Sequence, residues 1–494
     1  MSLLDLPPEI LSEILSHSTT ATSITQTCRE FAEIAYTIPS FWCDIRLGPR
    51  QCMWAGSLDL LQTRLQRARS PLKITVSRPR GSRVNTALVN DMYTMLSVRN
   101  MHISQIHIQT ESARSAGRIL YTIYPSLLTT FPKLTSFAVI VDEDPWPNPH
   151  KTHWPLLYTF LERAVPCFTN LTSFTIPTYE SSVPVFRPGT SCFNRLNTLI
   201  FDGSFEGQES NMAMIVALLH HTPQVETIWF KTEIKYTTMD LGSSVIPRTI
   251  RNFADVPRPA FLPCLTHLAV STPGAGSDLF RCIDAPALQD LHIDGARRIR
   301  DRDPDDVDTS WVLWYVASQR LAIRELGRRS PNLRRLAITD TLFNRREWLW
   351  MLAGTEPEGP PFRSLESLTL SQFLPFDIKH DVEDAAVWFD EDILGSYSAE
   401  GMILRRLAVR RCNFPLSGAT LVDMFKKSIE KSATSGSSGS FVLAIDSSCT
   451  GITEDHITEL TAAGVLVKNV GEVEEHEWWA QGFRLDPRDS HVFI

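Results

Sequence analysis

One pattern of apolar and polar positions returns along the chain from residue 100 onward. It consists of an apolar residue, two variable residues, an apolar residue, one variable residue and a third apolar residue. The alternation that ends the pattern is typical of a β-strand. The pattern predicts ten strands, with the triplets Ile103/Ile106/Ile108, Leu134/Phe137/Val139, Leu171/Phe174/Ile176, Leu196/Leu199/Phe201, Val225/Ile228/Phe230, Leu265/Leu268/Val270, Leu288/Leu291/Ile293, Leu333/Leu336/Ile338, Leu365/Leu368/Leu370 and Leu404/Leu407/Val409.

Helical periodicity precedes several of these predicted strands. It is present over Trp154–Val165, Asn211–His221, Trp311–Arg329 and Arg345–Ala353. One helix–strand unit cannot bury its apolar side alone, whereas stacked units share a continuous core. We therefore predict an α/β solenoid with parallel strands on its concave face and helices on its convex face. The array resembles a divergent leucine-rich-repeat region; the simpler alternative is a coincidence of Leu spacing in a Leu-rich chain.

The first fifty residues have a different pattern. Leu6-Pro7-Pro8-Glu9-Ile10-Leu11 predicts the start of a helix, because proline is tolerated in a first turn and Glu9 suits its positive end. Ile14 and Leu15 continue its apolar face. A second helix is expected over residues 23–35 and a short third element from Pro39. Three short helices bury little surface by themselves, so a partner is expected to cover part of them.

These residues resemble an F-box, a three-helix unit that docks on a Skp-type adaptor in cullin–RING ubiquitin ligases. The resemblance covers Leu6 to Leu15, the run Cys28-Arg29-Glu30-Phe31 with Ala35, and Trp42. The alternative is a helical hairpin that packs on the rest of the chain. By resemblance, the candidate adaptor contacts are Leu6, Pro7, Ile10, Leu11, Ile14, Leu15 and Trp42.

The sequence divides into four predicted regions. These are an F-box-like adaptor-binding module at 1–50, transitional helix–strand units at 51–100, a leucine-rich-repeat-like solenoid at 101–433, and a cap and tail at 434–494. Insertions at 142–153, 237–259 and the acidic 372–401 are expected in loops on the solenoid rim. Recognition by these loops is possible in such proteins, but solvated charge is the simpler interpretation.

Charge and cysteine usage narrow the class of protein. The chain of 494 residues has 48 Lys and Arg against 56 Asp and Glu, a net charge of −8, which disfavours a nucleic-acid-binding protein. Its longest apolar run, Met212–Leu219, is far shorter than the ~20 residues that span a bilayer. The nine cysteines form no C-x-x-C pair, so a disulfide framework is disfavoured. A cytoplasmic or nuclear location is expected.

No motif for catalysis is present. The sequence has no phosphate-binding G-x-x-x-x-G-K-[ST] loop and no G-x-S-x-G nucleophile elbow. His150 and His153 lie in a Pro-broken segment that does not align metal ligands. We therefore expect no enzyme activity, no cofactor and no metal site.

Partner recognition is expected at the variable positions between the apolar ones, because these point away from the core. Trp and Arg are frequent at the centres of binding interfaces. The candidate substrate-binding residues are Trp229, Lys231, His267, Asp290, His292, Asp294, Arg335, Arg406 and Arg410.

The resemblance implies a substrate-recognition subunit of an SCF-type ubiquitin ligase. Its amino-terminal module would bind a Skp-type adaptor, and through it a cullin, while the repeats would bind a protein substrate. The alternative is a repeat-built scaffold or inhibitor with no role in ubiquitin transfer, in which the amino-terminal helices cap the solenoid. Neither nucleic acid nor a membrane is an expected partner.

Overall fold

The computed structural model describes most of the predicted elements. The residues it describes are 29, 33, 40–48, 57–68, 71–78, 86–99, 102–123, 131–141, 153–178, 184, 186, 191–204, 209–233, 259–270, 279–294, 322–339, 362–371, 403–410, 417–436, 439–445 and 451–469. They belong to two compact units, Met1–Phe205 and Glu206–Ile494.

The first unit alternates helices and strands. Its sheet has the order β1-β2-β3-β4-β5-β6, and the pairs whose register is described are parallel. Its elements are α4 (Ser40–Cys43), β1 (Asp44–Leu47), α5 (Ser57–Arg67), β2 (Leu72–Arg78), α6 (Thr86–Ser97), β3 (Ile103–Thr110), α7 (Ala113–Ile123), β4 (Ser136–Val141), α8 (His153–Ala164), η3 (Val165–Cys167), β5 (Ser173–Thr178), η4 (Ser191–Arg195) and β6 (Thr198–Ser204).

The second unit continues the same scheme. Its main sheet has the order β7-β9-β11-β12-β13-β14-β15-β16, again parallel, and β8 and β10 form a separate parallel pair. Residues 322–329 are helical. Its other elements are α9 (Glu209–His220), β7 (Thr227–Glu233), β8 (Ala260–Phe261), β9 (His267–Val270), β10 (Ile283–Asp284), β11 (Asp290–Asp294), β12 (Arg335–Thr339), β13 (Ser367–Ser371), β14 (Arg406–Arg410), α14 (Gly418–Thr434), β15 (Phe441–Ile445), α15 (Glu454–Ala462) and β16 (Val465–Asn469).

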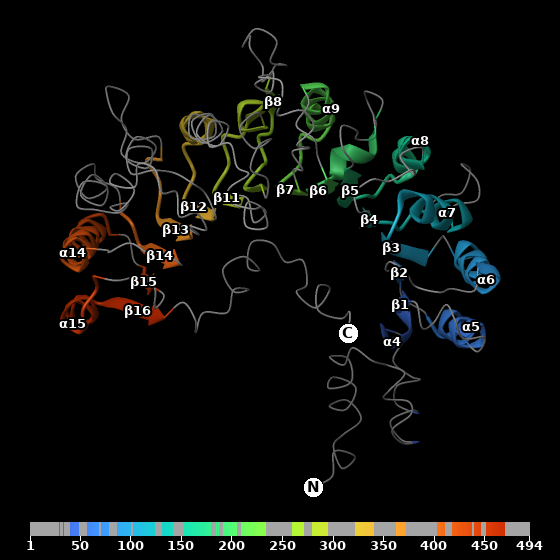
Figure 1. Cartoon of the computed structure of the whole chain (residues 1–494), viewed down its shortest axis with the longest axis horizontal. Coiled ribbons are helices and arrows are strands. Elements are labelled where there is room, and N and C mark those ends of the chain that lie inside the picture. Colours follow the sequence, from blue (N-terminus) through green and yellow to red (C-terminus); the bar gives the residue numbers. More distant parts are fainter. Residues whose placement is uncertain are drawn as a thin grey trace, which may run out of the picture. The chain divides into compact units, whose positions relative to one another are not determined.

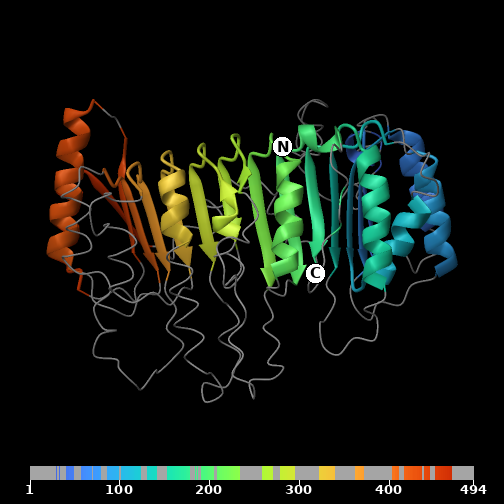
Figure 2. The same ribbon diagram turned by 90° about the horizontal axis from the view of Figure 1, so that it is seen from above.

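In the first unit α5–α8 lie on one side of the sheet, and in the second unit α9, α14 and α15 lie on one side of the sheet (Figure 1). The strands of each unit run side by side in one direction (Figure 2). We call the opposite side of the sheet the strand face. Parallel neighbours on one sheet, each reached by a crossover, fit a repeat solenoid.

A tight turn precedes β4–β7, β9 and β11–β13 and explains the first apolar position of the motif in these repeats. The backbone N–H of Leu171 donates to the carbonyl of Phe168 (3.2 Å), and that of Leu333 donates to Ser330 (3.1 Å). Both leucines are buried. The following N–H groups, at Thr172 for example, then donate to the preceding strand's turn. The motif therefore combines a core anchor with the first hydrogen bond to the neighbouring repeat.

Side chains add hydrogen bonds between repeats at the same turn. The hydroxyl of Thr172 donates to the carbonyl of Thr135 (3.0 Å), and the hydroxyl of Thr135 donates to Ser104 (3.2 Å). The amide of Asn332 donates to the carbonyl of Pro286 (2.9 Å). The carbonyls of Thr135 and Ser104 also accept a backbone N–H from the next repeat, so the hydroxyls add to the backbone hydrogen bonds between repeats.

A stack of phenylalanines fills the core of the first unit. Phe168 lies 5.8 Å from Phe131 and 5.3 Å from Phe137, both edge-on, and Phe137 lies 5.9 Å from Phe174. All four rings are at most 2% exposed. Since each ring comes from a different turn or strand, the stack ties successive repeats together.

The predicted strands are present, and several predicted helices are too. The period-2 end of each of the ten motifs lies in one of β3–β7, β9 or β11–β14, and β15, α15 and β16 occupy the predicted cap. Helix α14 was not predicted from the sequence. Helix Arg345–Ala353, residues 311–321, most of the three predicted insertions and the tail from 471 lie outside the described residues.

The sheet begins earlier than the predicted solenoid. β1 lies within the predicted 1–50 module, yet it pairs in parallel register with β2, from Asp44 opposite Lys73 to Leu47 opposite Val76. Of that module's predicted helices, only the short α4 and the helical residues 29 and 33 are described. The end of the module is thus part of the first unit's sheet.

We predict that Phe168→Ala opens the first unit locally. Removing a buried ring from this stack costs about 3–5 kcal/mol through lost burial and the remaining cavity. Because repeats can unfold in parts, hydrogen exchange at the amides of β4 and β5 is the suitable measurement. Phe261→Ala, at a ring that is 58% exposed, is the control and should change stability by no more than about 0.5 kcal/mol. Unchanged protection of β4 and β5 would contradict the role of the stack.

Candidate functional site

The predicted adaptor contacts lie at the amino end, where only one of them is described. Trp42 is 2% exposed, and Cζ of Arg67 lies 5.0 Å from the centroid of its ring. α4, which carries Trp42, packs against α5. The ring is therefore in this chain's own core and has little surface left for an adaptor. The other predicted contacts lie outside the described residues: Leu6, Pro7, Ile10, Leu11, Ile14 and Leu15.

The predicted substrate-binding residues fall into register rows across the second unit. In a parallel sheet, residues opposite one another on neighbouring strands lie on the same face. Row one is Thr227, His267, Asp290, Arg335, Ser367 and Arg406. Row two is Trp229, Ala269, His292, Ala337, Thr369 and Ala408. Row three is Asp294, Thr339, Ser371 and Arg410.

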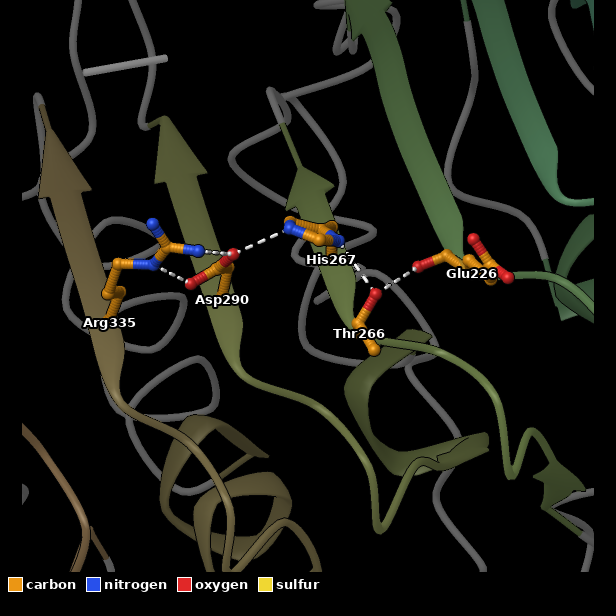
Figure 3. A network of polar contacts seen from close by, with 5 residues as sticks. All are labelled: Glu226, Thr266, His267, Asp290 and Arg335. Atoms are coloured by element: carbon orange, nitrogen blue, oxygen red, sulfur yellow. Dashed lines mark hydrogen bonds and ion pairs between the residues drawn. The ribbon is translucent and has the colours of Figure 1, made fainter. Parts of the chain in front are cut away.

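Row one holds four of the predicted residues, and three of them are in direct contact (Figure 3). Asp290 Oδ2 lies 2.8 Å from His267 Nε2 and accepts a hydrogen bond from Arg335 Nη2 at 2.5 Å. Arg335 Nε also donates to Asp290 Oδ1, so the arginine binds the carboxylate with two N–H groups. This two-point geometry holds a guanidinium in one orientation.

The network continues beyond His267 to the turn before β9. His267 Nδ1 lies 2.7 Å from the hydroxyl of Thr266, and that hydroxyl donates to the carbonyl of Glu226 (3.1 Å). The chain of contacts in Figure 3 thus runs from the turn before β7 to β12. Both ring nitrogens of His267 have a partner, so the imidazole is held with Nε2 toward Asp290 and Nδ1 toward Thr266.

Asp290 is the electrostatic centre of this network. Its side chain is only 15% exposed, whereas that of Arg335 is 53% exposed. Burial by itself raises the pKa of Asp290, but hydrogen bonds from His267 and then Arg335 outweigh it and leave the pKa below its ordinary value. Asp290 is therefore ionised at neutral pH, as a partner for Arg335 requires.

Arg406 lies in the same row, two strands from Arg335. Burial, and next the positive charge of Arg335, lower the pKa of Arg406. The two guanidinium groups thus repel each other, with Ser367 between them in the register. The row carries a negative charge at Asp290 of β11 and positive charges at Arg335 of β12 and Arg406 of β14.

Row two has a different character. Nζ of Lys231 lies 3.9 Å from the centroid of the Trp229 ring, a cation–π contact that covers part of the indole. His292 is partly exposed as a residue, but its Nε2 is buried. Burial lowers the pKa of His292 to about 4, so its ring is neutral near pH 7.

The outcome for the predicted site residues is mixed. His267, Asp290 and Arg335 are brought into contact, and Trp229 and Lys231 form a second pair. Asp294 and Arg410 share row three by backbone register, and their side chains lie outside the described part of the structure. A role of these residues in binding stays a prediction. The sequence analysis did not predict the parts that Thr266 and the carbonyl of Glu226 play in this network. A threonine directly before the strand recurs at Thr135 and Thr172, where its hydroxyl also donates to a carbonyl of the preceding repeat, and this recurrence could have indicated the contact.

Two further observations concern the described residues. They contain no group of three or more His, Cys, Asp or Glu side chains placed to hold a metal ion. Within the same residues, every helix is too short or too polar to cross a bilayer.

Comparison with known families gives a match at the amino end of the chain. Residues 3–47 match the F-box-like family. No curated protein matches the chain. F-box domains generally bind Skp-type adaptors, so the match suggests, at a coarse level, a substrate adaptor of an SCF-type ligase. The chain combines this F-box-like segment with a sheet of stacked parallel strands.

We predict that acid weakens the fold through His292. The unfolded ring takes up a proton near pH 6.5, the folded ring only near pH 4, so stability falls as the pH drops between these values. The loss should be on the order of 2 kcal/mol by pH 4.5, measured by urea unfolding. His292→Gln should flatten this dependence, and His102→Gln, at an exposed histidine, should not. Asp290 contributes a loss only below about pH 3.9, because its pKa is lowered.

Proposed function

We propose that the protein is a substrate-recognition subunit of an SCF-type ubiquitin ligase. The observation that carries this proposal is the F-box-like match at residues 3–47, followed by a repeat sheet whose strand face presents rows of polar side chains. The amino-terminal segment would bind a Skp-type adaptor, which links it to a cullin. The repeats, which we take to be leucine-rich-repeat-like, would bind a protein substrate.

In this role the protein needs no active site of its own. A receptor that holds a substrate beside a ubiquitin-charged enzyme raises the effective concentration of the substrate lysine. Holding a protein in one orientation requires a surface whose side chains are themselves fixed. The Arg335–Asp290–His267 contacts meet that requirement on the strand face. We propose a cytoplasmic or nuclear location, where such ligases act.

One observation favours a second candidate, a repeat scaffold without a role in ubiquitin transfer. Trp42 is buried, and β1 pairs with β2, so the end of the F-box-like segment also covers the edge of the first unit's sheet. In the scaffold hypothesis this capping is the main task of the segment. The two candidates differ in whether residues 1–39 bind an adaptor.

We predict that Leu6→Asp combined with Ile10→Asp abolishes adaptor binding. Both positions belong to the predicted apolar helix face, and a charge in an apolar interface cannot be solvated. Pull-down of the full chain with a purified Skp-type adaptor is the measurement. Leu466→Asp is the matched control, because Leu466 is 51% exposed on β16 and should leave capture unchanged. Equal capture of the double variant and the wild type would refute the adaptor assignment.

Deleting residues 1–39 should separate the two candidates. The cut leaves Trp42 and β1 in place, so the first unit keeps its edge strand. In the receptor hypothesis, the shortened chain unfolds cooperatively at nearly the same urea concentration but no longer captures the adaptor. A shift of the midpoint by more than about 1 M urea would instead favour a capping role.

A further inference from the structure

The strand face of the second unit is covered between β12 and β15. The side chains concerned belong to rows one and two, and each is at most 8% exposed: Ala337, Ser367, Thr369, Ala408, Val442 and Ala444. Val442 and Ala444 extend the two rows to β15, opposite Arg406 and Ala408. Leu466, which follows Val442 in row one on β16, is by contrast 51% exposed. The covered area therefore has a boundary at row one of β16.

The surroundings of Thr369 show that the sheet itself does not supply this cover. Its neighbours along β13 are Ser367 and Ser371, and its neighbours across the register are Ala337 and Ala408. All four residues are small, yet Thr369 is only 7% exposed. Side chains this short do not reach over a threonine, so the cover has to come from above the sheet.

The first unit gives an internal comparison for these positions. Ser136 and Ser173 hold the same motif position as Ser367, and Ala138 holds the same position as Thr369. Ser136, Ser173 and Ala138 are all partly exposed. A small side chain at these positions is therefore not buried by the strands alone.

The described elements of the second unit do not account for the cover. α9, α14 and α15 lie on the other side of the sheet, and no described helix or strand of this unit lies over the strand face (Figure 1). The long side chain of Arg335 is bonded to Asp290, on the side away from Thr369. This leaves the segments outside the described residues as the source of the cover.

Among these segments, residues 470–494 have the most suitable starting point. β16 ends at Asn469, next to β15, and the chain continues from that edge of the sheet. When extended, these residues span about 80 Å, whereas the distance from β16 to β12 is about 19 Å. The acidic insertion 372–401 instead joins β13 to β14, and the covered area extends beyond both strands.

The chemistry of residues 470–494 also matches the covered area. They include the aromatic residues Trp478, Trp479 and Phe483, and the covered side chains are mostly apolar. The residues before the two tryptophans are strongly acidic: Glu472, Glu474, Glu475 and Glu477. Row one carries the positive charges of Arg335 and Arg406. Both arginines already have contacts of their own, so we expect apolar burial to supply most of the affinity and charge to add long-range attraction.

We propose that residues 470–494 lie over rows one and two of β12–β15 and mask this part of the strand face. A substrate that uses these rows then has to displace the segment, so the chain carries its own competitor. Only this consequence rests on the proposed function, because the cover itself does not depend on a role in ubiquitin transfer.

Cysteine labelling of the full chain tests whether the face is covered. Thr369→Cys introduces a thiol of similar size in the covered area, and Leu466→Cys, at the exposed position on β16, is the matched control. Peptide mass spectrometry distinguishes each introduced thiol from the nine native cysteines. The Thr369→Cys variant should react with a maleimide about tenfold more slowly than the Leu466→Cys variant. Equal rates would overturn the cover.

Two changes in the tail test which segment is responsible. Trp478→Glu with Trp479→Glu should make the Thr369→Cys variant react about tenfold faster, because the new charges oppose burial on an apolar surface. Ending the chain at Asn469 should do the same, since every described element is kept. The Leu466→Cys variant should keep its rate, and the native Cys282, buried in the core, should stay unreactive. A rate at Thr369→Cys that neither change raises would overturn the assignment, as would a gain that Cys282 shares.

Other occupants of the face give different results. If the acidic insertion is the cover, replacing residues 374–399 by a Gly-Ser linker speeds the reaction at Thr369→Cys and the tail changes do not. If a second copy of the chain is the cover, dilution alone speeds the reaction. Either result would overturn the assignment to residues 470–494.

Adaptor capture separates this inference from the ligase role. Trp478→Glu with Trp479→Glu should leave capture by a Skp-type adaptor unchanged. Leu6→Asp with Ile10→Asp should lose the adaptor and keep the slow reaction at Thr369→Cys. Failure of the ligase role alone thus leaves the labelling result intact, and failure of the cover leaves adaptor capture intact.

Discussion

A parallel strand obtains its hydrogen bonds only from its two neighbours in the sheet, and this requirement organises both units. The repeats of β4–β7, β9 and β11–β13 enter their strands through the same turn, in which a buried residue such as Leu171 or Leu333 anchors the chain and the next N–H groups reach the preceding repeat. Since the turn sets the start of these strands, it also sets their register. Residues at one motif position therefore form straight rows across the strand face.

The register rows explain why the charged side chains of Asp290 and Arg335 lie next to each other on the strand face. Asp290 is mostly buried, and a buried carboxylate is stable only with partners that offset its lost hydration. The register places His267 on one side of it and Arg335 on the other. One acidic residue thereby fixes two neighbouring side chains, and the exposed guanidinium becomes a rigid feature of the surface.

The need of a strand for hydrogen-bonded neighbours also bears on the amino end of the sheet. The first strand of a sheet exposes an unpaired edge, and open edges favour aggregation. β1 follows directly on α4, which carries the buried Trp42 and packs against α5. The F-box-like match ends at residue 47, which is also the last residue of β1. The segment that matches an adaptor-binding family is thus joined to the repeats without an intervening linker, and the orientation of its last residues is determined by the sheet.

Local sequence patterns were sufficient to predict the repeated strands. An alternation such as Leu333/Leu336/Ile338 is visible within a few residues and does not depend on contacts with distant parts of the chain. The same patterns indicated which residues face away from the core. They therefore predicted that Asp290 and Arg335 lie on the same face of the sheet. Their contact was decided by tertiary structure, since 45 residues separate them and only the parallel register brings them together. The burial of Trp42 was decided in the same way: its sequence context indicates an apolar helix, but only the packing of α4 on α5 determines whether its ring faces a partner or the chain's own core.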